Sequence, residues 1–177
     1  LARKYDIEQV YPWEIKEALA EAGLMGVWIP KEYGGAGDGI LDLCICIEEL
    51  SRACGGVGVL YCVNALGSFP ILVGATEEQK KKYLPRVARK EISAFALTET
   101  DAGSDPANMS LRAEATEDGS AFILNGEKLW CTNLIKAGVL VVMVPMGPQR
   151  WGPDSEEWVI HLNYPVDCTE SDAQVEA

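Results

Sequence analysis

The sequence predicts an α+β protein, with an N-terminal α-helical domain (residues 1–91) followed by an antiparallel β domain (residues 92–145). Three observations support this prediction. Apolar residues recur at helical spacing up to about residue 90, they alternate with a period of two after it, and turn-forming residues separate the alternating segments. Residues 146–177 are treated as a divergent acidic tail, since they carry seven acids and one base.

The first predicted helix begins at Pro12, because a proline ring suits the first turn of a helix, and it ends at Gly23. Ile15 and Leu19 lie on its apolar face. Lys16 belongs to the opposite, charged face, which we expect to contact water.

The glycine-rich residues 23–39 predict an irregular crossing loop. Their glycines lack the G-x-G-x-x-G spacing and follow no strand, so no Rossmann nucleotide site is predicted. Two apolar segments, 40–54 and 57–66, then predict helices that are buried on most sides. A capping box over 76–79 starts a basic amphipathic helix, which we expect to end before Pro85 or soon after it.

Residues 92–98 alternate and predict a strand. The segments on either side of the polar turn at 117–120 predict a hairpin, and Asn125-Gly126 predicts a second hairpin that leads into a strand over 127–131. A last apolar strand is predicted over 137–144. We expect a ligand site where helices give way to strands, because seams between domains favour ligand binding.

The net charge of −12, from 27 acidic and 15 basic residues, excludes a general attraction to nucleic acid or to an anionic membrane. The six cysteines have no C-x-x-C spacing and His161 has no evident partner, so we predict reduced thiols in the core and no metal site. No apolar run is judged to reach the roughly 20 residues of a membrane span, and no signal peptide is visible. We therefore expect a protein of the cytoplasm or the mitochondrial matrix.

The stretch FALTETDAGSDP, residues 95–106, lies on the seam and by itself predicts a polar turn leaving a strand. A calcium loop is disfavoured, because the D-x-D-x-D-G order and the closing acid are absent. Four separated segments, however, resemble the acyl-CoA dehydrogenases in order and spacing. They are IPKEYGG (29–35), GATEEQKKKYLP (74–85), ALTETDAGSD (96–105) and NGEKLWCTN (125–133).

This resemblance implies that the antiparallel β domain is β-barrel-like, with FAD as cofactor and acyl-CoA as substrate. In the family, the strand matching residues 95–98 lies along the flavin ring. The resemblance implies that the Thr98 hydroxyl bonds the ring, that Trp130 packs on it, and that Ser104 contacts the CoA part of the substrate. The implied cofactor-binding residues are Phe95, Ala96, Leu97, Thr98, Trp130, Cys131 and Thr132.

The family removes the α-proton of the thioester with a glutamate from a third, helical domain, while the β-hydrogen leaves as hydride to flavin N5. Because the sequence stops before such a domain, the resemblance implies a truncated chain with an incomplete β-domain, no catalytic residue and weak flavin retention. Glu99 is disfavoured as a substitute base, since alternation places it opposite Thr98. The resemblance fades after Val144.

The resemblance also implies an electron-transfer flavoprotein as electron acceptor and a homo-oligomer at full length. Two alternatives stay open on the same fold. One is a non-catalytic module that binds acyl-CoA or a partner, and the other is an oxidase or acyl-carrier relative.

Overall fold

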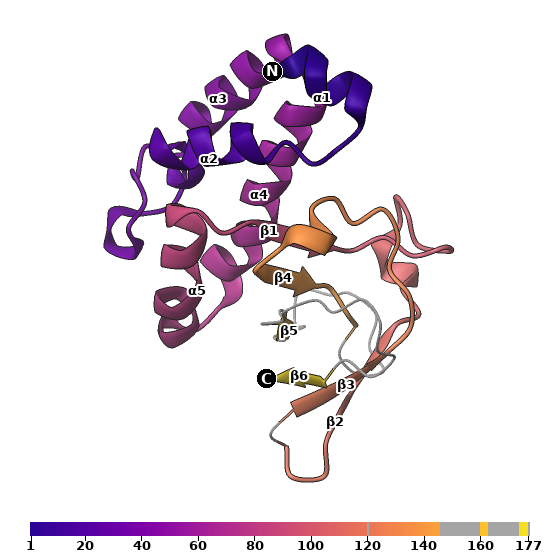
Figure 1. Cartoon of the computed structure of the whole chain (residues 1–177). Helices are drawn as coiled ribbons and strands as arrows, with labels where there is room; N and C mark the ends of the chain where they lie inside the picture. Colours follow the sequence, from indigo (N-terminus) through magenta and orange to yellow (C-terminus); the bar gives the residue numbers. More distant parts are fainter. Residues whose placement is uncertain (120, 146–159, 163–173, 177) are drawn as a thin grey trace.

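The computed structural model describes residues 1–119, 121–145, 160–162 and 174–176 (Figure 1). Its helical part precedes its strands, which confirms the predicted order of the two regions. The helices are α1 Ala2–Glu8, α2 Trp13–Glu21, α3 Ile40–Ala53, α4 Gly55–Gly74 and α5 Glu77–Arg89. The strands are β1 Ser93–Ala96, β2 Arg112–Ala115, β3 Ala121–Asn125, β4 Val139–Val142, β5 Ile160–Leu162 and β6 Gln174–Glu176.

Helix α4 is the centre of the molecule and packs against α3, α5 and β1 (Figure 1). By length and composition it could cross a membrane, so the prediction that no apolar run is long enough is wrong. Half of its most apolar window is buried inside the protein, and its Asn64 and Ser68 bond to other protein groups, as in the core helix of a globular domain. A Cβ at Gly67 would lie 2.7 Å from the Ser93 hydroxyl oxygen, so the glycine permits the close approach of α4 to β1.

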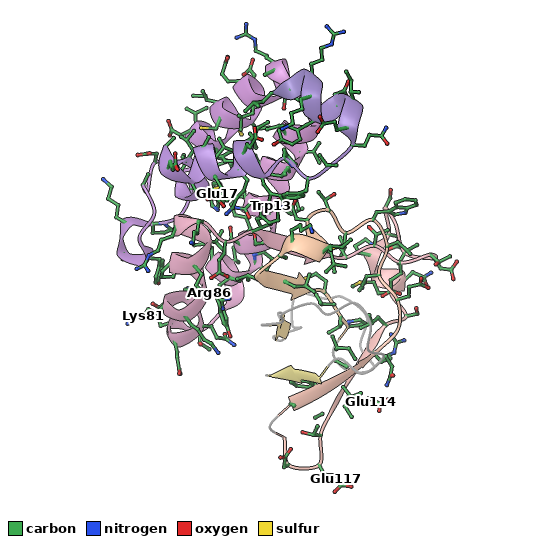
Figure 2. The ribbon with its side chains drawn as sticks, viewed as in Figure 1. Trp13, Glu17, Lys81, Arg86, Glu114 and Glu117 are labelled. Carbon is green, nitrogen blue, oxygen red and sulfur yellow. The ribbon has the colours of Figure 1, made fainter. Side chains whose placement is uncertain are left out.

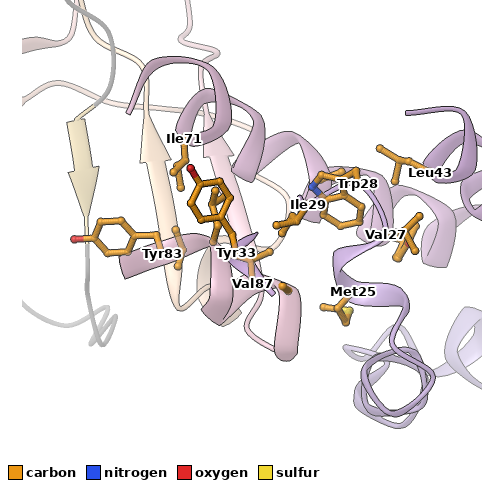
Figure 3. Packing of buried hydrophobic residues seen from close by; sticks show 14 of the residues in the cluster. Met25, Val27, Trp28, Ile29, Tyr33, Leu43, Ile71, Tyr83 and Val87 are labelled. Carbon is orange, nitrogen blue, oxygen red and sulfur yellow. The ribbon is translucent and has the colours of Figure 1, made fainter. Parts of the chain in front are cut away.

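The core of the helical part is centred on the glycine-rich loop rather than on a helix. Short 3-10 turns at Leu24–Gly26 and Lys31–Tyr33 confirm that this loop is irregular. The Trp28 side chain is only 4% exposed; its indole N–H donates to the Ser68 hydroxyl at 2.8 Å, and its ring meets Tyr61 edge-on. Figure 3 shows the buried loop residues beside those of α3, α4 and α5.

Two burial predictions for the helices are wrong. In α3, Leu43 is buried but Leu41 and Ile45 are exposed on the side turned away from it, so the helix is not surrounded by protein. In α2, Lys16 is buried, not exposed to water. Its long apolar stem packs inside while its ammonium group reaches Glu17 at 2.9 Å, which reconciles a charged residue with a buried position.

The capping box at the start of α5 is confirmed, because Thr76 and Gln79 bond each other's backbone N–H groups. The helix contains Pro85 and ends soon after it, at Arg89, as predicted. Buried Leu84 and Val87 flank the proline, and their burial offsets the hydrogen bond that the proline removes.

The strands form two three-stranded sheets, in the orders β1-β4-β5 and β2-β3-β6. The hairpin of β2 and β3 is confirmed, with Arg112 opposite Asn125. The expectation of a purely antiparallel domain is wrong, because β1 pairs with β4 in parallel, Ser93 opposite Val139. The long connection between them returns the chain in the same direction. Among the described strands no closed barrel forms.

The second predicted hairpin, with its strand over 127–131, is also wrong. Gly126 has a φ of 146° and lies against Leu111, where a Cβ would come within 2.7 Å of the Leu111 Cα. The chain then crosses to the end of β1, so tertiary contacts override the local turn signal.

An ion pair fastens the helical part to the strands. The Arg86 guanidinium bonds both carboxylate oxygens of Glu91 and the carbonyl of Gly138, just before β4. Figure 2 shows Arg86 near this junction, whereas Glu114 lies on β2 and Glu117 lies at the far end of the β2–β3 hairpin.

All cysteines in the described part of the chain are free thiols. The prediction that thiols fill the core is wrong for Cys44 and Cys62, which are exposed. Cys168 and most of the predicted acidic tail lie outside the described residues. His161 lies on β5, one of the two edge strands of its sheet as far as the structure describes it.

Candidate functional site

A cleft of about 210 Å³ lies on the seam between the helical part and the strands. Helix α4 forms one wall, the end of β1 forms a second, and the segment 129–132 forms a third. The lining residues are Val63, Leu66, Phe95, Leu97, Thr98, Leu129, Trp130 and Thr132.

Five of the seven residues implied as cofactor-binding therefore line one cleft, although more than 30 positions separate Thr98 from Trp130 along the chain. Ala96 and Cys131 instead pack with a second apolar cluster that contains Leu111 and Val142. Their side chains belong to this cluster and are not part of the cleft lining.

Sequence reasoning missed Val63, Leu66 and Leu129. Val63 and Leu66 are three residues apart on α4, a spacing that places both on one helix face. Because α4 is largely apolar and has no charged residues, the pattern did not distinguish this face from the buried ones.

Trp130 has an unusual position for a large apolar side chain. It is 88% exposed and its φ is 57°, in the left-handed region that residues with a bulky side chain rarely adopt. An indole ring exposed at the edge of a cleft offers a flat apolar surface to a ligand.

Three hydrogen bonds connect the end of β1 to the segment that carries Trp130. The Leu129 N–H donates to the Thr98 carbonyl at 2.8 Å, and the Lys128 ammonium donates to the Leu97 carbonyl at 2.9 Å. The Cys131 thiol donates to the Phe95 carbonyl at 3.3 Å. Burial raises the pKa of this thiol, which keeps it protonated and able to donate.

Glu99 is 5% exposed and forms a buried ion pair with Lys128 at 2.8 Å. The backbone N–H and the hydroxyl of Ser110 also donate to its carboxylate, as does the N–H of Leu111. Burial opposes ionisation, but Lys128 and the other donors outweigh it and lower the pKa of Glu99 to about 2. Glu99 is therefore a charged structural residue and a very weak base.

The polar turn at residues 99–108, weighed above as a calcium loop, is held by hydrogen bonds of its own backbone and of one of its acids, Asp105. Glu99 and Ala102 exchange two backbone hydrogen bonds, and the Asp105 carboxylate accepts from the N–H of Ala107 at 3.2 Å. Ser104 is exposed on this turn, a few residues after Thr98 of the cleft.

Comparison with known families decides the affiliation of the chain. The model of the acyl-CoA dehydrogenase N-terminal domain matches residues 1–91, and that of the acyl-CoA dehydrogenase middle domain matches residues 94–161. The chain belongs to the acyl-CoA dehydrogenase family. The second match passes Val144, so the family likeness extends further than the sequence motifs indicate.

Individual acyl-CoA dehydrogenases and related proteins agree with this affiliation. The mitochondrial isovaleryl-CoA dehydrogenase of Solanum tuberosum is 39% identical over 150 residues, which cover 80% of this chain and 35% of that protein. The crystal structure of an acyl-CoA dehydrogenase from Bacillus anthracis complexed with FAD has a TM-score of 0.74 and 35% identity, over 85% of this chain and 25% of that chain.

A chain in the structure of the electron transferring flavoprotein of Acidaminococcus fermentans has a TM-score of 0.75 and 36% identity, over 82% of this chain and 40% of that chain. The present chain thus spans less than half the length of each of these relatives.

Proposed function

We propose that this chain forms the flavin-binding part of an FAD-dependent acyl-CoA dehydrogenase, which removes hydrogens from the α and β carbons of an acyl-CoA thioester. The observation that carries the proposal is the cleft. In a member of this family, Thr98, Trp130 and Thr132 line one hollow on the seam between the helical part and the strands. Bound there, FAD supplies the hydride acceptor, at N5 of its flavin ring.

The cleft residues fit a flavin ring. Such a ring is flat and largely apolar with a polar edge, so it needs an apolar wall and a few fixed hydrogen-bonding groups. Trp130 and Phe95 provide aromatic surface, and the hydroxyls of Thr98 and Thr132 provide polar groups. The hydrogen bonds between the walls hold these groups in place before a ligand arrives, which lowers the entropy lost on binding.

We assign Ala96 and Cys131 a supporting role behind the cleft, consistent with their place in the second apolar cluster. The Cys131 thiol holds the segment that carries Trp130 against β1 through the Phe95 carbonyl. Their contribution to cofactor binding is therefore to fix the backbone of the two walls.

The acyl group of the substrate is assigned to the α4 side of the cleft. Val63 and Leu66 line this side, and the exposed Val59 continues the same apolar helix face beyond the cleft. Ser104 is assigned to the CoA part, because an exposed hydroxyl on a tight turn suits a long polar ligand.

Glu99 is not the base that takes the α-proton. That proton is weakly acidic, so the base needs a pKa near the working pH, whereas the pKa of Glu99 is about 2. We assign no catalytic residue within the described part of the chain. In the family a glutamate of a following helical domain has this role, and we propose that turnover requires it.

The remaining expectations are part of the same proposal. They are an electron-transfer flavoprotein as acceptor, a homo-oligomer at full length, a barrel that includes the two small sheets, and a place in the cytoplasm or the mitochondrial matrix. The likeness to a chain of an electron transferring flavoprotein structure supports the expected electron acceptor. The mitochondrial relative from Solanum tuberosum supports the expected compartment.

Titration of the purified chain with FAD, followed by flavin fluorescence, tests the proposal. We expect weak binding by the wild type and an affinity about tenfold lower in Trp130→Ala, since an aromatic contact contributes up to about 1.5 kcal/mol beyond its buried area. Trp13→Ala is the matched control, because Trp13 is also exposed (43%) but lies on α2 outside the cleft.

Absence of binding by the wild type, or equal affinities in the three proteins, would refute the proposal. Adding acyl-CoA to the FAD-loaded chain is the second step. Loss of the visible flavin band would contradict the need for a base from a further domain. Binding of acyl-CoA by a chain that takes up no FAD would favour the non-catalytic module.

A further inference from the structure

We propose that Asn133 is a positioning residue of the cleft, whose side chain holds the segment carrying Trp130 and Thr132 against the other two walls. The expected effect of Asn133 on FAD binding rests on the function proposed above. The hydrogen bonds of the Asn133 side chain do not depend on that function. Asn133 acts from behind, since the cleft is lined by its neighbours.

The Asn133 amide forms hydrogen bonds to three different parts of the chain. Its Nδ2 donates to the Leu60 carbonyl at 3.1 Å and to the Ser93 carbonyl at 3.4 Å. Its Oδ1 accepts from the Tyr11 hydroxyl at 3.5 Å. Asn133 is only 9% exposed and its two Nδ2 bonds are buried, so breaking them would leave buried polar groups unpaired.

Each of the two elements that accept from Asn133 Nδ2 carries a wall of the cleft. Leu60 lies on α4, about one turn before Val63 and two turns before Leu66. Ser93 begins β1, two residues before Phe95. Asn133 itself directly follows Thr132 of the third wall. One side chain therefore joins the elements that form all three walls.

The backbone of the third wall, residues 129–132, requires contacts that hold its conformation. Both Trp130 and Asn133 have positive φ, 57° and 72°. Asparagine tolerates the left-handed conformation, but a tryptophan retains it only where its surroundings over-determine it. Since Trp130 is exposed, its own side chain contributes little packing, and the anchorage must come from the flanking residues.

The surface on which Asn133 rests is rigid. The backbone N–H of Ser93 donates to Asn64 Oδ1 at 2.6 Å, and the Ser93 hydroxyl donates to the Asn64 carbonyl at 2.5 Å. Asn64 and Ser93 are fully buried, so α4 and β1 form one frame. Removing the Asn133 side chain would therefore loosen the segment that carries Trp130, while α4 and β1 would keep their positions relative to each other.

Fluorine NMR of the full chain labelled with fluorotryptophan, without FAD, tests the inference. The Trp130 resonance is assigned by its loss in Trp130→Phe. Asn133→Gly removes the amide but keeps a residue suited to positive φ, and it should shift and broaden the Trp130 resonance while leaving that of Trp28 unchanged. Asn108→Ala is the control, because Asn108 also donates to a backbone carbonyl, that of Asp101, but on the exposed turn.

In the presence of FAD we expect Asn133→Gly to lower the affinity about tenfold and Asn108→Ala to leave it unchanged, since the first variant loses two buried hydrogen bonds. An unchanged Trp130 resonance in folded Asn133→Gly would overturn the inference. If the wild type binds no FAD, the proposed function fails, while the Trp130 resonance still decides the role of Asn133.

A measurement on the wild type covers the case in which Asn133→Gly does not fold. The side-chain amide protons of Asn133 should exchange with solvent much more slowly than those of Asn108, which is exposed. Equal exchange rates would show that the Asn133 amide is not held by its three partners, and would also overturn the inference.

Discussion

The helical part and the cleft region are held together by different kinds of contact. The core of the helical part contains large apolar side chains, among them Met25, Trp28 and Ile29. The buried cluster beside the cleft is smaller, with Ala96, Leu111, Val142 and Val144. There the chain depends on buried polar contacts, chiefly the Glu99–Lys128 pair and the Asn133 amide.

The two kinds of contact have different effects: apolar burial mainly stabilises the fold, whereas buried hydrogen bonds mainly fix the positions of side chains. Burial of apolar surface is strongly favourable but has no preferred direction. A buried hydrogen bond adds little net free energy, yet it specifies distance and angle, and leaving one partner unpaired is costly. The helical part therefore supplies most of the stability, and the polar contacts place Thr98, Trp130 and Thr132.

The largest predicted effect is in the apolar core. Trp28→Ala should lower the free energy of unfolding by about 4 kcal/mol, because it leaves a cavity and unpairs the Ser68 hydroxyl from the indole. Denaturant unfolding followed by circular dichroism measures the loss. A loss below about 1 kcal/mol, the size expected for the exposed Trp13→Ala control, would contradict the assignment of this core.

The second prediction concerns the buried ion pair. Lys128→Met should cost about 3 kcal/mol, because the Glu99 charge then stays buried without its cation. The double variant with Glu99→Gln should lose less than Lys128→Met alone, which a double-mutant cycle measures. Strictly additive losses would show that the two residues do not act as a pair.

The third prediction is a pH dependence. The pKa of Glu99 is lowered from 4.5 to about 2 on folding, so its stabilisation is present above pH 4.5 and is lost as the pH falls toward 2. The difference in unfolding free energy between wild type and Glu99→Gln should shrink by roughly 2 to 3 kcal/mol over this range. Carboxylates shared by both proteins cancel in this comparison. A difference that stays constant with pH would refute the lowered pKa.

The smallest predicted effect lies on the surface of the helical part. Thr76→Ala should cost about 1 kcal/mol, because it removes the side-chain cap of α5. Thermal unfolding measures this loss, and Gln79→Ala should reproduce part of it by removing the reciprocal bond. A neutral Thr76→Ala would show that the cap is not formed in solution.

Local patterns predicted the elements whose causes are local. The capping box at Thr76 and the β2–β3 hairpin were found because a few adjacent residues determine each of them. Patterns failed where distant contacts decide the outcome. Residues 127–131 leave the expected hairpin because Lys128 and Leu129 bond to the end of β1.

For the cleft, the family resemblance singled out Thr98, Trp130 and Thr132, which the structure brings together. It did not single out Val63 and Leu66, since a largely apolar helix without charged residues does not reveal which face borders a cleft. Nor did it reveal the proposed positioning role of Asn133, because its hydrogen-bond partners Leu60 and Ser93 lie far away in the sequence.

The sequence by itself determined the order of helices and strands, the start of α5 and the family motifs, because periodicity and capping act over a few residues. Only the tertiary structure decided the parallel pairing of β1 with β4, the burial of Lys16 and the structural role of Glu99. The physical reason is that burial and ion pairing depend on which distant segments meet, and these contacts form only when the whole chain is packed.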